Sequence, residues 1–152
     1  MGKVTKSIEI EASPEKVFAF MCDLEKMNEI TKGSHTSSFV ESVYTSKGPI
    51  GVGTTRHTVG KFGGQRAEFD MEITEFEKNK KLSIRTIGSS KFKWHGTDVL
   101  ETTAKGTKLT SNIDYEPPYS VIGKIIDKLW VHKDIEKGIE RSLNDMKKAL
   151  ET

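Results

Sequence analysis

Three side chains in the middle of the chain carry groups that could move a proton: His57, Asp98 and Tyr115. Each lies in a segment of alternating pattern, and counting in steps of two assigns all three to the inner face of a predicted sheet. A buried Asp–His pair beside an apolar pocket could remove a proton alpha to a carbonyl that Tyr115 polarises. An aldol-type cyclase or dehydratase requires such chemistry. The alternative is that His57 faces solvent or is satisfied by hydrogen bonds, and that Asp98 caps a strand end.

The inner faces of the same segments favour a pocket. In residues 65–77 apolar and charged side chains alternate, so the apolar set is expected inside. Yet Thr55, Thr86 and Ser111 interrupt the inner faces, and each unpaired polar group in a dry core would cost ~1–3 kcal/mol. Apolar walls with a few polar points are typical of a small-molecule site, although simple core packing is the alternative. The predicted lining is Phe20, Thr55, His57, Phe69, Met71, Ile84, Thr86, Trp94, Asp98, Leu100, Ser111, Ile113, Tyr115, Ile122, Ile125, Ile126 and Leu129.

The remaining motifs predict neither a cofactor nor a metal ion. Gly51-Val52-Gly53 begins like a dinucleotide loop, but residue 56 is Arg rather than Gly and a strand is predicted to follow, not a helix. The four histidines lack metal-ligand spacing, and a single cysteine, Cys22, makes a structural zinc site unexpected. No serine-centred nucleophile elbow occurs.

Length and charge limit the class of protein and its partners. The 152 residues are predicted to form one domain, 1–152, with a net charge of +2. Basic and acidic residues nearly balance in each third of the chain, which argues against a nucleic-acid face. We expect no transmembrane segment and no signal peptide, because the apolar runs are short. The lone Cys22 excludes an internal disulfide, so a reducing cytoplasm is expected.

The last part of the chain reads as one long amphipathic helix, or two joined end to end, over residues 119–152. Its apolar positions are three and four residues apart. The half after Ile135 keeps its apolar side chains within roughly 80°, as packing on a sheet requires, whereas Val121 to Trp130 sweep roughly 180° at about 100° per residue. That wide arc must face a ligand cavity, a covering loop or a membrane.

The elements that must position these side chains follow a simple order. A strand at 4–12 precedes a helix that begins at Ser13-Pro14, with Ser13 as N-cap, and a second short helix at 24–31. Six strand candidates then follow, at 36–45, 53–61, 65–77, 82–89, 92–103 and 107–116. The turn residues between them favour an antiparallel meander. The class is therefore α+β, with a curved sheet wrapped around the last helix.

Four stretches fit this order of elements and match a known pattern: IEIEASPEKVF at 8–18, DLE at 23–25, EITEFEKNKKL at 72–82 and GTKLT at 106–110. In these stretches and in the order of its elements, the chain resembles the START-like, or Bet v 1-like, helix-grip superfamily, in its polyketide cyclase/dehydrase-like branch. Where many relatives carry Pro and Trp in the second helix, Asn28 and Ile30 stand here. The resemblance implies a seven-stranded antiparallel sheet that grips the C-terminal helix and encloses a cavity. Members of the superfamily bind sterols, phospholipids, quinones, plant hormones or aromatic polyketides.

Three functions follow as hypotheses. The first is binding or transport of a hydrophobic small molecule or lipid in the cavity. The second is a cyclase or dehydratase that acts on a polyketide-like or aromatic substrate there. The third is a protein-interaction module that buries the arc from Val121 to Trp130 against a partner, with transient membrane contact. Fold alone does not choose between them, nor does the sequence fix the oligomeric state.

Overall fold

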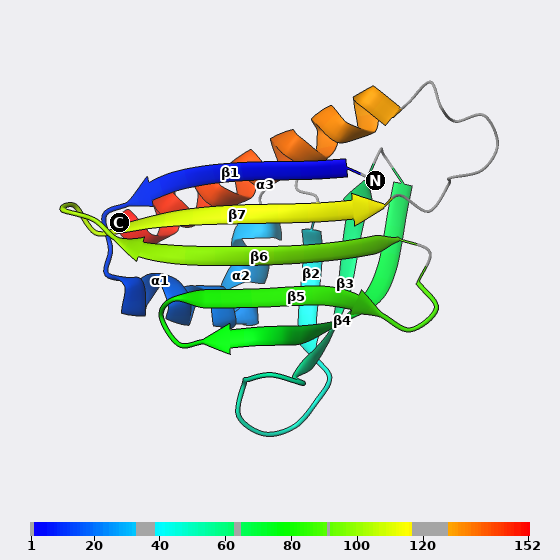
Figure 1. Cartoon of the computed structure of the whole chain (residues 1–152), viewed down its shortest axis with the longest axis horizontal. Coiled ribbons are helices and arrows are strands. Elements are labelled where there is room, and N and C mark those ends of the chain that lie inside the picture. The colour runs from blue at the N-terminus through cyan, green and yellow to red at the C-terminus, as the bar shows by residue number, and fades with distance from the viewer. Residues whose placement is uncertain (1, 33–38, 63–64, 91, 117–127) are drawn as a thin grey trace.

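A curled antiparallel sheet wraps around the C-terminal helix in the computed structural model, which describes residues 2–32, 39–62, 65–90, 92–116 and 128–152 (Figure 1). The elements are β1 (Gly2–Ile10), α1 (Pro14–Cys22), α2 (Leu24–Lys32), β2 (Phe39–Tyr44), β3 (Thr55–Phe62), β4 (Gln65–Glu77), β5 (Lys81–Ile87), β6 (Lys93–Thr102), β7 (Thr107–Glu116) and α3 (Lys128–Glu151). The seven strands lie in the order β1-β7-β6-β5-β4-β3-β2, each pair antiparallel. This confirms the predicted α+β helix-grip architecture.

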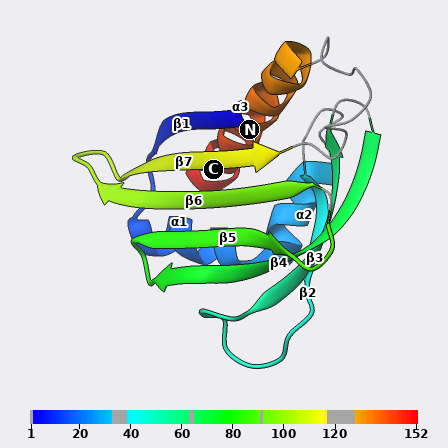
Figure 2. The ribbon, with the colours of Figure 1, turned by 45° about the vertical axis from the view of Figure 1, so that its right-hand side comes forward.

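The sheet curls because its two halves run in different directions. In Figure 1 β1, β7, β6 and β5 run side by side and roughly horizontally, whereas β2 and β3 run roughly vertically. β4 turns the corner between the halves, as Figure 2 shows, and its pairing with β5 shifts register between Ile73 and Glu75. An irregularity of this kind bends a strand and increases its twist. The curl gives the sheet an inner face on which the helices lie.

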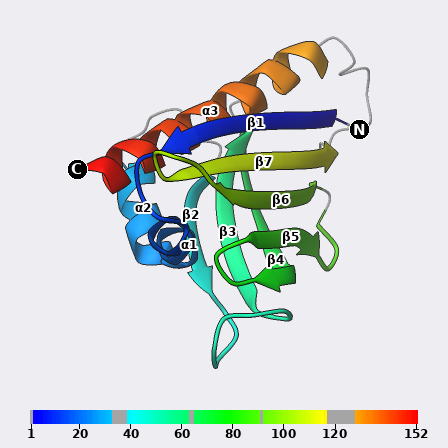
Figure 3. The same ribbon diagram turned by 60° about the vertical axis from the view of Figure 1, so that its left-hand side comes forward.

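The two short helices cover the same inner face at one end of the molecule (Figure 3). The side chain of Ser13 accepts a hydrogen bond from the backbone N–H of Lys16 at 3.3 Å, with Pro14 at the first helical position. Asp23 plays the same part for α2, since its Oδ1 accepts from the N–H of Lys26 at 3.2 Å. Each cap satisfies a backbone donor that the first turn leaves open. The predicted N-cap at Ser13 is confirmed.

α3 contributes one apolar face to the core. Its buried side chains repeat at steps of three and four: Val131, Ile135, Ile139, Leu143 and Met146. This confirms the narrow seam predicted for the second half of the helix. The earlier part of the predicted helix, residues 119–127, lies outside the described residues. None of the described helices combines the length and the apolarity that crossing a membrane demands.

The inner faces of β4, β6 and β7 carry the side chains that the alternation predicted. Phe69, Met71 and Ile73 of β4 are buried, as are Trp94 of β6 and Leu109 of β7. The inner face of β3, in contrast, was predicted wrongly. Residues that face each other across an antiparallel pair of strands point to the same side of the sheet. Arg56 and Thr58 pair with Met71 and Phe69 and so point inward, whereas Thr55, His57 and Val59 belong to the outer face.

Candidate ligand-binding cavity

A cavity of about 150 Å³ lies between the inner face of the sheet and α3. Its walls are mostly apolar, from Leu82 and Ile84 on β5 to Leu143 and Met146 on α3. Three polar side chains enter it from the sheet: Arg56 on β3, Asp98 on β6 and Ser111 on β7. The arrangement matches the usual description of a small-molecule site, in which a few polar groups orient a ligand between apolar walls.

Asp98 and Ser111 form a pair within this cavity. They lie directly opposite each other on β6 and β7, and the Ser111 hydroxyl donates a hydrogen bond to Asp98 Oδ1. Burial raises the pKa of the Asp98 carboxyl, against the opposing effects of the Ser111 hydrogen bond and the Arg56 charge. Desolvation disfavours the charged form of a carboxyl, so Asp98 is a partly buried acid with an increased tendency to hold its proton.

Arg56 is the cationic group of the cavity. Its Nε is fully enclosed and has no hydrogen-bond partner among the described residues. Burial lowers the pKa of Arg56, while the nearby Tyr44, Asp98 and Cys22 act in the opposite direction. Since a guanidinium does not lose its proton in proteins, the side chain brings a positive charge to the cavity.

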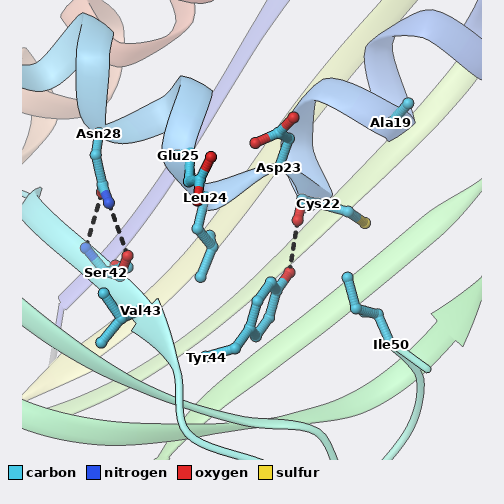
Figure 4. Close-up of a pocket in the computed structure, with 10 residues that line it drawn as sticks. All are labelled: Ala19, Cys22, Asp23, Leu24, Glu25, Asn28, Ser42, Val43, Tyr44 and Ile50. Atoms are coloured by element: carbon cyan, nitrogen blue, oxygen red, sulfur yellow. Dashed lines mark hydrogen bonds between the residues drawn. The ribbon is translucent and has the colours of Figure 1, made fainter. Parts of the chain in front are cut away.

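Tyr44 stands beside Arg56 on the next strand. The two residues face each other across the β2–β3 pair, and the Tyr44 hydroxyl donates to the carbonyl oxygen of Cys22 at 2.8 Å (Figure 4). Burial raises the pKa of Tyr44 to about 12. The phenol is therefore neutral at physiological pH and ties β2 to the end of α1 rather than neutralising Arg56.

A second, open groove of about 500 Å³ lies between β2 and the helices α1 and α2. Figure 4 shows Asn28 reaching from α2 to the backbone of Ser42, where Nδ2 donates to the carbonyl oxygen at 2.8 Å and Oδ1 accepts from the N–H at 2.9 Å. The amide thus takes the place of a neighbouring strand at the sheet edge. Asn28, noted above as a departure from the family pattern, has this structural role.

Two aromatic side chains that line the cavity, Phe39 and Trp94, belong to a larger aromatic cluster. Trp94 contacts Phe39 edge-on at 5.0 Å between ring centroids and stacks on Phe92 at 5.9 Å. Tyr115 follows at 6.5 Å from Trp94 and lies 2.7 Å, Oη to Nδ1, from His132 of α3. The last contact links the end of the sheet to the start of the described helix through a hydrogen bond between side chains.

The predicted proton-transfer cluster is not formed. His57 lies on the outer face, with Nδ1 2.9 Å from Asp70 and Nε2 3.2 Å from Glu68. Asp98 enters the cavity from the inner face instead, and Tyr115 bonds to His132. The hypothesis that His57, Asp98 and Tyr115 converge is therefore wrong, and the solvent-facing alternative for His57 holds.

The predicted lining residues divide into groups. Those that line the cavity are Ile84, Trp94, Asp98, Ser111 and Ile113. Those packed in the surrounding core are Phe20, Phe69, Met71, Leu100 and Tyr115. Thr55 belongs to the outer face, and the Thr86 hydroxyl accepts from the backbone N–H of Trp94 at 3.2 Å. Ile122, Ile125 and Ile126, together with the side chain of Leu129, lie outside the described part of the chain.

Sequence reasoning missed Arg56, which the register places inside. A signal for it was present, because Gly63-Gly64 predicts a two-residue hairpin loop. Counting outward from such a loop pairs Phe62 with Gln65 and Arg56 with Met71, as the structure shows. Since Met71 was assigned to the core, its partner had to share that face.

Comparisons with known proteins agree with this architecture. The family model for polyketide cyclase / dehydrase and lipid transport matches residues 1–151. Among solved structures, TTHA0849 from Thermus thermophilus is similar with a TM-score of 0.81 at 20% identity, over 98% of this chain and 97% of that one. BH1534 from Bacillus halodurans has a TM-score of 0.70 at 18% identity, over 99% of this chain and 98% of that one. MLL2253 from Mesorhizobium loti has a TM-score of 0.70 at 17% identity, over 98% of this chain and 96% of that one.

No curated protein matches the sequence. The likeness to solved structures, at these identities, shows the fold. The family match spans both the sheet and α3, between which the cavity lies. The chain therefore belongs to the polyketide cyclase/dehydrase and lipid transport family.

Proposed function

We propose that this protein binds a hydrophobic small molecule or lipid in the cavity between the sheet and α3. The observation that carries the proposal is a space of about 150 Å³ with mostly apolar walls, into which the sheet contributes three polar side chains, Arg56, Asp98 and Ser111. A well-packed interior leaves few voids larger than a water molecule, so a space of this size is unusual in a core. The family, whose description includes lipid transport, supports the same reading.

The experiment that tests this binding is native mass spectrometry of the purified protein, followed by extraction and identification of any retained ligand. Ser142→Leu provides the matched comparison, because Ser142 lines the cavity from α3 and leucine would fill part of it. Asn144→Leu, two residues along the same helix and exposed, is the control. Retained ligand in the wild type and Asn144→Leu, but not in Ser142→Leu, supports the proposal. Retention by all three proteins would place the ligand elsewhere.

A second candidate, a cyclase or dehydratase in the same cavity, is favoured by one observation. Asp98 is a partly buried carboxyl in the cavity with a raised pKa, and groups perturbed in this way are suited to proton transfer. Turnover of an identified ligand by the wild type but not by Asp98→Asn would support this candidate. Binding without turnover leaves the carrier function.

The interaction hypothesis depends on the arc from Val121 to Trp130, of which the structure describes the side chain of Trp130. Its exposed fraction is 54%. A Trp130→Ala variant with unchanged hydrodynamic size and unchanged ligand retention would speak against a role for this position in partner binding.

A further inference from the structure

Arg56 combines three properties that together call for a ligand. It points into the cavity, it carries a permanent positive charge, and its enclosed Nε has no acceptor among the described residues. Buried polar groups in native proteins are almost always paired, and a buried donor without a partner lowers the free energy of unfolding. A group that satisfies Arg56 when bound would remove this penalty.

The neighbouring acid does not satisfy Arg56. Asp98 acts on the guanidinium through its charge, but no ion pair joins the two described side chains. Asp98 is instead held by the hydroxyl of Ser111 on the opposite strand. Burial raises the pKa of Asp98, which weakens this carboxyl as a counter-charge, and no ion pair joins its side chain to Arg56 in the described part of the chain.

The other polar neighbours are equally unsuited. Burial raises the pKa of both the Tyr44 phenol and the Cys22 thiol, so each favours its neutral form. The Tyr44 hydroxyl already donates its proton to the carbonyl oxygen of Cys22. On the facing side of the cavity, the described lining residues of α3 are uncharged: Gly138, Ser142 and the apolar Ile139, Leu143 and Met146.

The chemistry of the missing partner follows from the guanidinium. Its Nε and one terminal nitrogen form a planar fork that matches the two oxygens of a carboxylate. The volume of the cavity limits the size of the ligand's apolar part, since about 150 Å³ lined by apolar side chains accommodates about one aromatic ring. Around this space lie Ile84, Trp94 and Ile113, which would contact such a body.

We infer that Arg56 is the recognition group for a small monocarboxylate, whose carboxylate pairs with the Nε edge of the guanidinium and whose apolar body, about one ring in size, fills the cavity. This inference rests on the proposed function, because it names the ligand class of the same cavity. It distinguishes the site from one that selects neutral hydrophobic molecules by shape alone.

The test uses two probes on the full chain, benzoate and toluene, each titrated while amide and indole signals are followed by NMR. Benzoate carries the acidic group and toluene offers a ring of similar size without charge. Both are expected to shift signals from cavity residues such as Ile84 and Trp94. Benzoate should bind the wild-type protein more tightly than toluene does.

Arg56→Met removes the charge while keeping an unbranched apolar side chain. It should weaken benzoate binding at least about tenfold, since a hydrogen bond to a charged group is lost, and leave toluene binding within about twofold. Arg56→Lys keeps the charge but not the planar fork, so it should restore part of the benzoate affinity. Arg85→Met, which removes an arginine that lies 3.6 Å from Glu72 on the outer face, is the control.

The outcomes separate this inference from the proposed function. If toluene binds in the cavity and benzoate binds Arg56→Met as tightly as the wild type, the carboxylate inference is overturned while the cavity function stands. If neither probe shifts the cavity signals of the wild type, both are overturned. Circular dichroism of each variant establishes that the fold is retained, and Arg56→Lys serves if Arg56→Met does not fold.

Discussion

Arg56 lies directly opposite Met71 across the β3–β4 pair, so a guanidinium shares the inner face of the sheet with a thioether that is fully buried. Transferring a charge to such a place is costly unless it is paired. The structure shows no partner for Nε among the described residues, which makes this position an exception within an otherwise consistent core. Such exceptions are typical of functional positions, where stability is given up for a specific interaction.

Replacing Arg56 with Met should stabilise the ligand-free protein. The substitution removes an unpaired buried donor, and we expect the free energy of unfolding to rise by about 1 kcal/mol. Urea denaturation measures this change, with Arg85→Met on the outer face as the control. A fall of similar size would instead mean that Arg56 supports the fold.

Asp98 should make stability depend on pH in a defined direction. Its pKa is raised above the ordinary value of 3.8, so the folded protein binds the proton more tightly than the unfolded chain does. The contribution of Asp98 to stability is therefore present at acid pH and declines as pH rises from that value through the folded pKa. Asp98→Asn should remove this decline, so the free energy of unfolding of the variant should rise relative to that of the wild type as pH increases. The range from about pH 3.5 to about pH 8 covers the titration of a perturbed carboxyl.

Unfolding free energies measured across that range decide the point. Asp114→Asn, which changes an exposed carboxylate 3.7 Å from Lys3, is the matched control. If the wild type and Asp98→Asn differ by the same amount at every pH, Asp98 titrates alike in the folded and unfolded states, and the raised pKa is wrong.

His57 should contribute stability in the opposite window. Its hydrogen bonds with Asp70 and then Glu68 raise the pKa of the imidazole above the ordinary 6.5. The protonated form is thus favoured by folding, so its contribution is fully present below pH 6.5 and is lost as pH rises through the folded pKa. Because the side chain is 38% exposed, the effect of His57→Gln should be only about a few tenths of a kcal/mol.

The same variant tests the role of the outer face. His57→Gln should leave ligand retention unchanged, because the imidazole is on the opposite side of β3 from the cavity. Thermal unfolding at pH 5.5 and 8.5, about one to two units either side of the ordinary value, should show a larger difference from the wild type at the lower pH. A loss of ligand retention would contradict this placement.

The hydrogen bond between Tyr115 and His132 should stabilise the contact between β7 and α3. The two atoms are 2.7 Å apart and the rings are stacked with centroids 6.0 Å apart. Tyr115→Phe keeps the ring but removes the hydroxyl, which should lower the free energy of unfolding by about 1 kcal/mol. A double-mutant cycle with His132→Phe isolates the pair, and a coupling energy near zero would show that the contact contributes nothing.

The alternation of apolar and charged residues decided much of the fold. In β4 and β7 one face is almost wholly apolar, so the inward set could be assigned from the sequence, as Phe69 and Leu109 illustrate. The buried seam of α3, from Ile135 to Met146, is likewise a consequence of its spacing. In β3 both faces carry polar side chains, so the alternation does not indicate whether Arg56 or His57 faces inward.

What the sequence determined by itself is the set of elements and the inner faces of those with a strong pattern, because burial of apolar surface acts on each segment separately. What only the tertiary structure decided is which polar groups meet. Asp98 reaches Ser111, and Tyr115 reaches His132, through pairings between distant segments. Arg56 enters the cavity because β4 sets the register of β3. Strand register and sheet curvature are properties of the whole assembly, so side chains of similar polarity can take opposite faces according to their partners.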